Sequence, residues 1–151
     1  TLTPTASVTD ATNLITLDNT GFANASGNIG SGITASNNYA IDTQRPTATL
    51  VVADNALSIG ETSLVTITFS EAVTGFTLAD LSVSNGTLSA LSSNNGGITW
   101  TATYTPTNNI TSTTNVITLN NTGVTDLAGN TGSGLSVSNN YAIDTARPTA
   151  D

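Results

Sequence analysis

Apolar residues along this chain alternate with polar ones and do not recur at helical spacing. Clusters of turn residues interrupt the alternation at intervals of roughly 8–12 positions, which is typical of an all-β sandwich of short strands. We expect the segments 81–83 and 87–91 to pair with each other. The predicted strands are residues 13–18, 34–41, 48–52, 63–69, 75–77, 81–83, 87–91, 97–105, 115–120 and 136–143.

Part of the chain occurs twice. Residues 1–49 and 103–151 align at an offset of 102 with 30 identities in 49 positions, including the phrase SNNYAIDT. A fixed period of this kind is the mark of a tandem array of similar domains. The chain therefore holds one complete repeat, residues 47–145, preceded by the C-terminal half of another, residues 1–43.

We expect the half repeat to contain the end of one strand, the counterpart of the strand predicted at 97–105, followed by the strands 13–18 and 34–41. Residues 44–46 are a linker, and residues 146–151 are a linker and the start of a further repeat. Each linker contains an Arg-Pro pair, Arg45-Pro46 and Arg147-Pro148. Proline fixes its own φ and biases the preceding residue to extended conformations, so we predict stiff connections.

Seven strands in about 100 residues, with a long connection between the last two, fit an immunoglobulin-like antiparallel β-sandwich. We therefore predict an all-β chain of such repeats in tandem. Trp100, the only tryptophan, alternates with polar residues on the strand predicted at 97–105. It is expected to point inward as a core anchor.

The charge balance limits the possible functions. Ten acidic residues stand against two arginines, and the net charge is −8, without lysine or histidine. Such a chain repels nucleic acid and anionic lipid, so we expect neither a nucleic-acid partner nor membrane insertion; a metal cation is the simplest partner that suits it. Without histidine or cysteine, the usual nucleophile pairs, disulfides and zinc sites are excluded. We predict that the chain is not an enzyme.

Three phrases carry a resemblance to a known family: VTITFSEAVTGF at 65–76, GVTDLAGNTG at 123–132, and AIDTxRPTA at 40–48 and 142–150. They resemble the bacterial Ig-like tandem repeats that serve as extender domains of giant type 1-secreted surface adhesins. The resemblance implies a secreted, cell-surface location, a role in cell adhesion and frequent calcium binding. The half repeat departs from it, because Asn24 stands where Asp126 begins the phrase DLAGN.

The carboxylates lie almost wholly in turns and loops. In an immunoglobulin-like sandwich the N-terminal linker and two of the loops share one pole, which brings together Asp42, Glu71 and Asp126. Asp10 approaches this junction from the half repeat, and Asn130 offers an amide oxygen. Calcium takes six to eight oxygen ligands of these kinds, so we predict a Ca²⁺ site at the junction.

At the opposite pole, Asp54 and Glu61 are expected to approach Asp144, which makes a second junction with the same chemistry. An alternative without metal stays open. Asp42 and Asp144 could instead cap turns through Asx hydrogen bonds, and Glu71 could pair with Arg45.

Two functions follow from these features. The first is a structural extender module of a long extracellular bacterial adhesin or surface filament, stiffened by calcium at its interdomain junctions. Its partners are the adjacent repeats of the same chain. The alternative is a glycan-binding or self-binding module that forms a polymer with other copies through strand complementation, because the half repeat would leave apolar side chains such as Leu17 and Tyr39 exposed to water.

Overall fold

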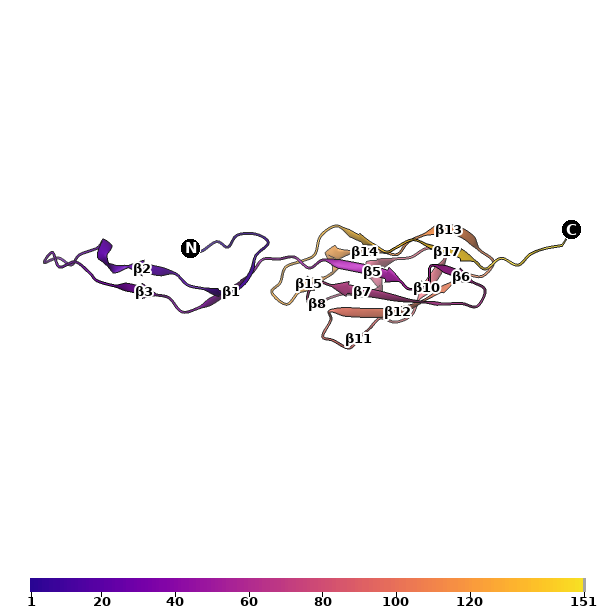
Figure 1. Ribbon diagram of the computed structural model, residues 1–151, viewed down its shortest axis with the longest axis horizontal. Helices are drawn as coiled ribbons and strands as arrows, with labels where there is room; N and C mark the ends of the chain where they lie inside the picture. The colour runs from indigo at the N-terminus through magenta and orange to yellow at the C-terminus, as the bar shows by residue number, and fades with distance from the viewer. Residues whose placement is uncertain (151) are drawn as a thin grey trace. The chain divides into compact units, whose positions relative to one another are not determined.

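The computed structural model describes residues 1–150 and is all-β, as predicted: strands and three short 3₁₀ helices make up its regular structure. The chain divides into two compact units, Thr1–Gln44 (unit 1) and Arg45 onward (unit 2), within the linker predicted at 44–46 (Figure 1). The 3₁₀ helices are η1 (Asn19–Gly21), η2 (Leu78–Asp80) and η3 (Asn121–Gly123).

Unit 2 is a sandwich whose first layer is one antiparallel sheet in the order β10-β12-β7-β5, with β11 also paired to β12 (Figure 1). Burial alternates strictly along β7, where Val65, Ile67 and Phe69 face the interior and Leu64 and Thr68 face solvent. The strands are β5 (Ala48–Val52), β7 (Ser63–Phe69), β10 (Gly86–Leu88), β11 (Ser92–Ser93) and β12 (Thr99–Pro106).

The second layer of unit 2 is made of shorter pieces. One sheet has the order β13-β17-β6, with β6 parallel to β17, and another has the order β16-β14-β9; β15 pairs with β8. The strands are β6 (Ala56–Ser58), β8 (Val73–Thr74), β9 (Leu81–Ser82), β13 (Thr111–Asn115), β14 (Thr118–Asn120), β15 (Thr125–Asp126), β16 (Leu135–Val137) and β17 (Tyr141–Asp144).

The core of unit 2 lies between these layers. Tyr104 of the first layer and Tyr141 of the second are both fully buried, with ring centroids 5.1 Å apart in an edge-on arrangement. Trp100 packs edge-on against Phe76 at 5.4 Å and donates from Nε1 to the Gly97 carbonyl at 3.0 Å. Trp100 packs against the core as predicted, but it is only partly buried. The other fully buried large side chains are Val52, Leu57, Val65, Ile67, Ile117, Leu119, Val124 and Ile143.

Asparagine side chains tie the layers of unit 2 together. The Oδ1 atom of Asn139 accepts from the Val52 amide at 2.8 Å, and its Nδ2 donates to the Val52 carbonyl at 3.1 Å. This side chain thus reaches from the second layer to β5 in the first. Within the second layer, Asn115 donates from Nδ2 to the Tyr141 carbonyl at 2.9 Å.

Unit 1 repeats two strand pairs of the second layer of unit 2. Its strand β1 pairs with β4 through Thr9↔Asp42 and Asn13↔Tyr39, and adding 102 to each number gives the pairs of β13 with β17. The pairing of β2 with β3 matches that of β14 with β16 in the same way. The strands are β1 (Thr9–Asn13), β2 (Thr16–Asp18), β3 (Ile33–Ala35) and β4 (Tyr39–Asp42).

Several predicted strands are wrong in detail. The end of a strand expected at the start of the half repeat is absent, since no strand lies in residues 1–8. The strand predicted at 75–77 is displaced to Val73–Thr74, because Gly75 has a φ of +83° and leaves the extended conformation there. The segments 81–83 and 87–91 do not pair with each other. β9 pairs with β14 and β10 with β12, and the turn at Asn85, with a φ of 57°, lies between them.

The strands predicted at 115–120 and 136–143 are each interrupted. Asn115 ends β13, and its ladder with β17 shifts register between Ser112 and Asn115. Asn140 accepts the Asn115 amide on its Oδ1 at 3.0 Å, so a side chain replaces a backbone partner at this point. The alternation of apolar residues cannot reveal where a side chain replaces a backbone hydrogen-bond partner.

Candidate functional site

The carboxylate of Asp126 closes a tight turn at one end of unit 2. Asn130 donates to it twice, from its backbone amide to Oδ1 at 2.8 Å and from its Nδ2 to Oδ2 at 2.9 Å. The Asp126 amide donates back to the Asn130 carbonyl at 3.1 Å, and Gly129 takes a φ of +95° that few other residues adopt. The phrase DLAGN therefore holds the Asp126 side chain in one orientation.

The same turn determines the protonation state of Asp126. The side chain is only 3% exposed, and burial raises its pKa. The hydrogen bonds from Asn130, and then those from the Gly129 and Ala128 amides, outweigh burial and leave the pKa of Asp126 below its ordinary value. A nearly buried carboxylate is thus held ionised at neutral pH.

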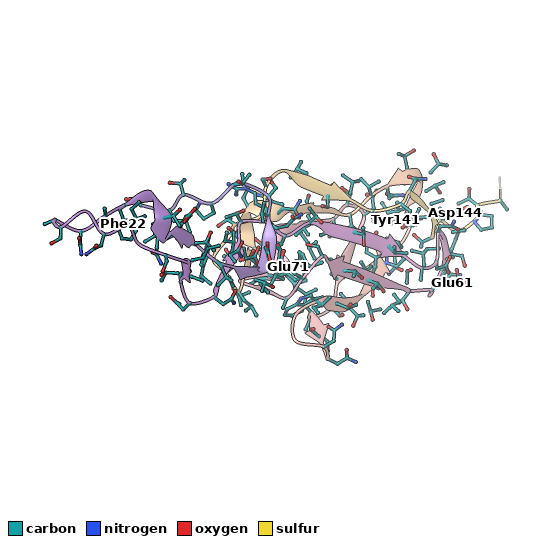
Figure 2. All side chains as sticks on the ribbon, turned by 60° about the vertical axis from the view of Figure 1, so that its left-hand side comes forward. Phe22, Glu61, Glu71, Tyr141 and Asp144 are labelled. Atoms are coloured by element: carbon teal, nitrogen blue, oxygen red, sulfur yellow. The ribbon has the colours of Figure 1, made fainter. Side chains whose placement is uncertain are left out.

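Glu71 brings a second carboxylate to this end of unit 2. It lies two residues after β7 and two before β8, and β8 pairs with β15 through Val73↔Asp126. This register places a carboxylate oxygen of Glu71 within 4.8 Å of one of Asp126. The predicted approach of these two residues is therefore observed. Glu71 lies at the end of unit 2 opposite to Glu61 and Asp144 (Figure 2). Two like charges this close favour a cation nearby.

Arg45 fixes the start of unit 2 beside the same turn. Its Nη1 donates to the carbonyl of Thr131, which forms a bridge with Thr125 across the base of the turn. The arginine of the linker phrase is thus anchored to the segment that positions Asp126.

Two of the predicted ligands belong to unit 1, where both make local bonds. Asp42 ends β4, and its Oδ1 accepts from the Thr9 hydroxyl at 3.0 Å and the Gln44 amide at 3.1 Å. The Oδ1 of Asp10 accepts from the Thr12 amide at 2.9 Å. The Asx turn proposed as the alternative for Asp42 is therefore present.

The carboxylates of the opposite end of unit 2 also serve turns. Asp54 accepts from the Ala56 amide at 3.0 Å, and Asp144 accepts from the Thr111 hydroxyl at 3.1 Å and the Ala146 amide at 3.3 Å. Glu61 accepts from the hydroxyl and amide of Ser58, which lower its pKa. Within residues 1–150, Asp54, Glu61 and Asp144 are not among the acidic groups close enough to hold one metal ion.

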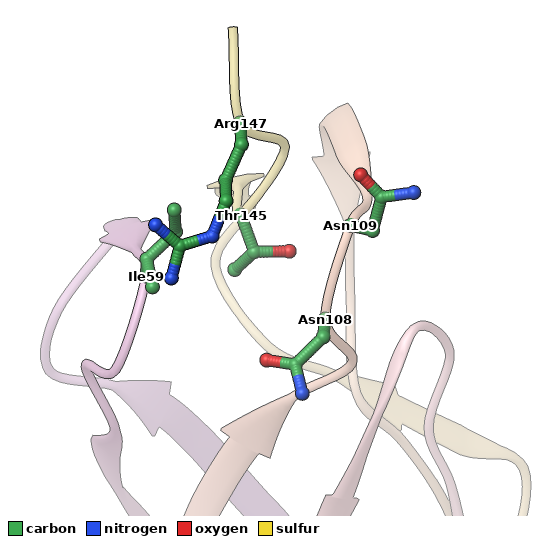
Figure 3. A pocket seen from close by; sticks show the side chains of 5 residues that line it. All are labelled: Ile59, Asn108, Asn109, Thr145 and Arg147. Carbon is green, nitrogen blue, oxygen red and sulfur yellow. The ribbon is translucent and has the colours of Figure 1, made fainter.

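A pocket of about 360 Å³ opens at this end of unit 2, lined by Ile59, Asn108, Asn109, Thr145 and Arg147 (Figure 3). The Arg147 guanidinium reaches down beside Ile59 and is the one charged group among these five residues. A pocket with a cationic lining does not suit a metal ion.

Unit 1 contains the counterpart of the DLAGN turn with a neutral side chain. Asn24 stands at the position of Asp126, and its Oδ1 accepts from the amides of Ser26 and Asn28 at 3.0 Å each. Gly27 has a φ of +83°, like Gly129. The turn therefore forms with an amide as well as with a carboxylate, so its closure does not require the negative charge of Asp126.

The layers, the strand registers and the repeated turns define a tandem array of immunoglobulin-like β-sandwich repeats. The family model of the bacterial Ig-like domain matches residues 1–41 and 42–143, and the chain belongs to this family. The second match takes in Asp42 together with Glu71 and Asp126. Comparison with curated proteins and with solved structures gave no match. In the described part of the chain, no helix has the length and apolar character needed to cross a membrane.

Replacing Asp126 with asparagine is expected to reduce the acid sensitivity of unit 2. Because the folded-state pKa of Asp126 is lowered, its ionised form stabilises the fold above the ordinary aspartate pKa, and this stability is lost as the pH falls through the lowered pKa. The Asp126→Asn variant should not show this loss of stability at low pH. Its free energy of unfolding at pH 7 should be smaller than that of the wild type by about 1 kcal/mol. Urea unfolding between pH 7 and pH 2, followed by Trp100 fluorescence, measures both effects. An unchanged pH profile contradicts the assignment.

Proposed function

We propose that this chain is a structural extender segment of a long extracellular bacterial adhesin or surface filament, whose repeats are stiffened by calcium at their junctions. The observation that carries the proposal is the close approach of Glu71 and Asp126 at the end of unit 2 where the linker enters. Membership of the bacterial Ig-like family, the tandem repeat and the Arg-Pro linker support it.

The proposed calcium site takes its fixed ligands from unit 2. Asp126 is ionised and held by its turn, and Glu71 lies beside it. Asp42 is the third carboxylate of the proposed site, as the sequence predicts from its place in the linker phrase. Backbone carbonyls, water and the Asn130 amide oxygen would complete the six to eight ligands that calcium takes.

The other predicted ligands have lesser roles in this proposal. Asp10 and Asp54 serve local turns, and neither lies in the group that contains Glu71 and Asp126. Asp144 occupies the place of Asp42, 102 residues further along the chain, and makes the same hydroxyl and amide hydrogen bonds. The Asx role and the metal role are compatible, because each aspartate has two oxygens with several lone pairs.

Calcium is expected to raise the melting temperature of unit 2. A ligand that binds only the folded state adds about 2.7 kcal/mol at a hundred times its dissociation constant. For a domain of this size that corresponds to roughly 10–20 °C. Calorimetry with excess calcium and then with excess chelator measures the difference, and equal melting temperatures would rule the site out.

Matched variants identify the residues on which the calcium-dependent rise in melting temperature depends. Glu71→Gln and Asp126→Asn remove one charge each from the site and should abolish most of the calcium effect. Asp18→Asn removes one charge from unit 1 and should leave it intact. Asp18 accepts from the Thr20 amide and hydroxyl, and Asn120 makes the same bonds to Thr122 in unit 2, so asparagine is known to fit this position. An equal loss in all three variants would indicate nonspecific charge screening.

The glycan-binding alternative has less support in unit 2. All five of its aromatic residues, Phe69, Phe76, Trp100, Tyr104 and Tyr141, belong to the core or pack against it. Aromatic platforms for sugar rings must be exposed. Phe22 in unit 1 is 52% exposed, but its counterpart in unit 2, Val124, is fully buried.

A further inference from the structure

Two asparagines of unit 2 are followed by glycine, in the pairs Asn85-Gly86 and Asn95-Gly96. Because glycine has no Cβ, its backbone amide can approach the preceding asparagine side chain closely and attack the Cγ atom, and the asparagine then loses ammonia. Both asparagines are exposed, so exposure does not distinguish the two pairs. Their hydrogen bonds do.

The side chain and the backbone of Asn85 are both held. Its Nδ2 atom, which would be the leaving group, donates to the Oδ1 of Asn115 at 2.9 Å, and Asn115 is only 3% exposed. The Asn85 carbonyl accepts from the Thr107 amide at 2.8 Å. Gly86 lies in β10 against the fully buried Tyr104, whose ring a Cβ on Gly86 would meet at 2.5 Å. Attack on Asn85 therefore requires this part of the domain to open.

The pair Asn95-Gly96 lies in the turn between β11 and β12 (Figure 1). Within residues 1–150, neither the Gly96 amide nor the Nδ2 of Asn95 donates a hydrogen bond. A Cβ on Gly96 would meet nothing within 4 Å, so the backbone here has open space around it. The attacking nitrogen and the leaving group of this pair are thus both available to water.

The Oδ1 atom of Asn95 is the part of the side chain that is held. It accepts from the Thr99 amide at 2.8 Å and from the Ser93 hydroxyl at 3.3 Å, and the Gly97 amide donates to that hydroxyl at 3.2 Å. Oδ1 is the atom that becomes negative when the Gly96 nitrogen adds to Cγ. Donors directed at a developing negative charge stabilise the transition state. The turn therefore favours the addition.

We propose that Asn95 is a site of spontaneous deamidation in the folded chain and that Asn85 is protected from the same reaction. The Gly96 nitrogen gives its proton to hydroxide and bonds to the Cγ of Asn95. The Cγ–Nδ2 bond then breaks, and ammonia leaves with a proton taken from water. A water molecule opens the resulting cyclic imide at either carbonyl carbon, so the product is aspartate or isoaspartate. Water and hydroxide are the only co-reactants.

The reaction changes a turn that is attached to two other parts of unit 2. The Gly97 carbonyl accepts from the Val73 amide at 3.3 Å and from the Nε1 of Trp100 at 3.0 Å. Isoaspartate formed from Asn95 lengthens the main chain by a carbon atom shortly before Gly97, and either product adds a negative charge to the turn. The modification thus acts on the segment that holds Trp100 and β8. The proposal does not depend on calcium.

The test incubates the full chain at mildly alkaline pH and follows both sites by mass spectrometry. Pepsin digestion at low pH separates the sites, because Leu88 and Leu91 lie between them. Asn95 should deamidate at least about 10-fold faster than Asn85, since a tenfold factor corresponds to about 1.4 kcal/mol, close to the contribution of one hydrogen bond. Equal rates in the folded chain, or a faster reaction at Asn85, would overturn the proposal.

The same chain in concentrated urea is the matched control, because both asparagines still precede glycine there. The two rates should become similar in urea. A ratio that persists unchanged would show that the neighbouring residues and not the fold set the selectivity, against the proposal.

The variant Asn95→Gln and the identity of the product test the chemistry. Glutamine has a longer side chain and would need a larger ring, so the variant should lose the reaction at this position while Asn85 reacts at its wild-type rate. Ammonia release from the folded variant at the wild-type rate would place the reaction elsewhere. The wild-type peptide should contain isoaspartate, and aspartate alone would contradict attack by the Gly96 amide.

Discussion

Leu119→Ala is expected to lower the free energy of unfolding of unit 2 by about 2–5 kcal/mol, whereas Leu17→Ala should change the stability of the chain by less than about 0.5 kcal/mol. The two leucines occupy equivalent positions on β14 and β2. Leu119 is fully buried in the core, so its truncation removes apolar contacts and leaves a cavity, whereas Leu17 is 54% exposed. The difference between the two stability losses therefore reports the effect of burial, because the residue type and the local structure are the same in both positions.

The measurement is urea unfolding followed by Trp100 fluorescence, which reports unit 2 because the chain has a single tryptophan. Far-ultraviolet circular dichroism follows the whole chain in parallel. Similar losses of stability in the two variants would mean that Leu17 is covered in solution by something that unit 1 itself does not supply. In that event the comparison should be repeated at several protein concentrations.

Hydrophobic alternation was sufficient to predict the strands β5, β7 and most of β12 in the first layer of unit 2, but not β11 or the pairing of β10 with β12. The predicted strands 48–52 and 63–69 coincide with β5 and β7, because every second residue of β7 faces the core. The second layer was predicted less well. Its strands end at Asn115 and around Asn139 and Asn140, whose amides bond to backbone groups. A three-residue strand such as β6 is also too short for any periodicity to be visible.

The sequence predicted which loops form the candidate site, but not the individual hydrogen bonds within it. The placement of loops in an immunoglobulin-like sandwich brought Glu71 and Asp126 to one end, as observed. The individual bonds of Asp126 to Asn130 could not be derived from spacing alone, since an Asx residue also bonds within its own turn. The equivalent turn at Asn24 shows whether the turn needs a negative charge, which the sequence does not reveal. The equivalent turn closes with an amide, so the geometry of the turn does not require the charge of Asp126, although that charge stabilises the fold at neutral pH.

Asn139→Ala should lower the free energy of unfolding of unit 2 by about 2–6 kcal/mol, and Asn37→Ala should have an effect below about 0.5 kcal/mol. Removal of the Asn139 amide leaves the amide and the carbonyl of Val52 without their partner, and Val52 is only 2% exposed. Each unsatisfied buried backbone group costs about 1–3 kcal/mol. The chain has no cysteine, so no disulfide compensates for the lost connection between the layers.

A third variant, Asn139→Asp, distinguishes the two hydrogen bonds. Aspartate still accepts from the Val52 amide but cannot donate to the Val52 carbonyl, and it places a negative charge against that oxygen. Its stability should recover toward the wild type at low pH, where the protonated carboxyl can donate again, whereas Asn139→Ala should show no such recovery. Urea unfolding at pH 7 and at pH 3 measures this difference. If Asn139→Ala unfolds at the wild-type urea concentration, the two layers are held together by apolar packing alone, and the role assigned to Asn139 is wrong.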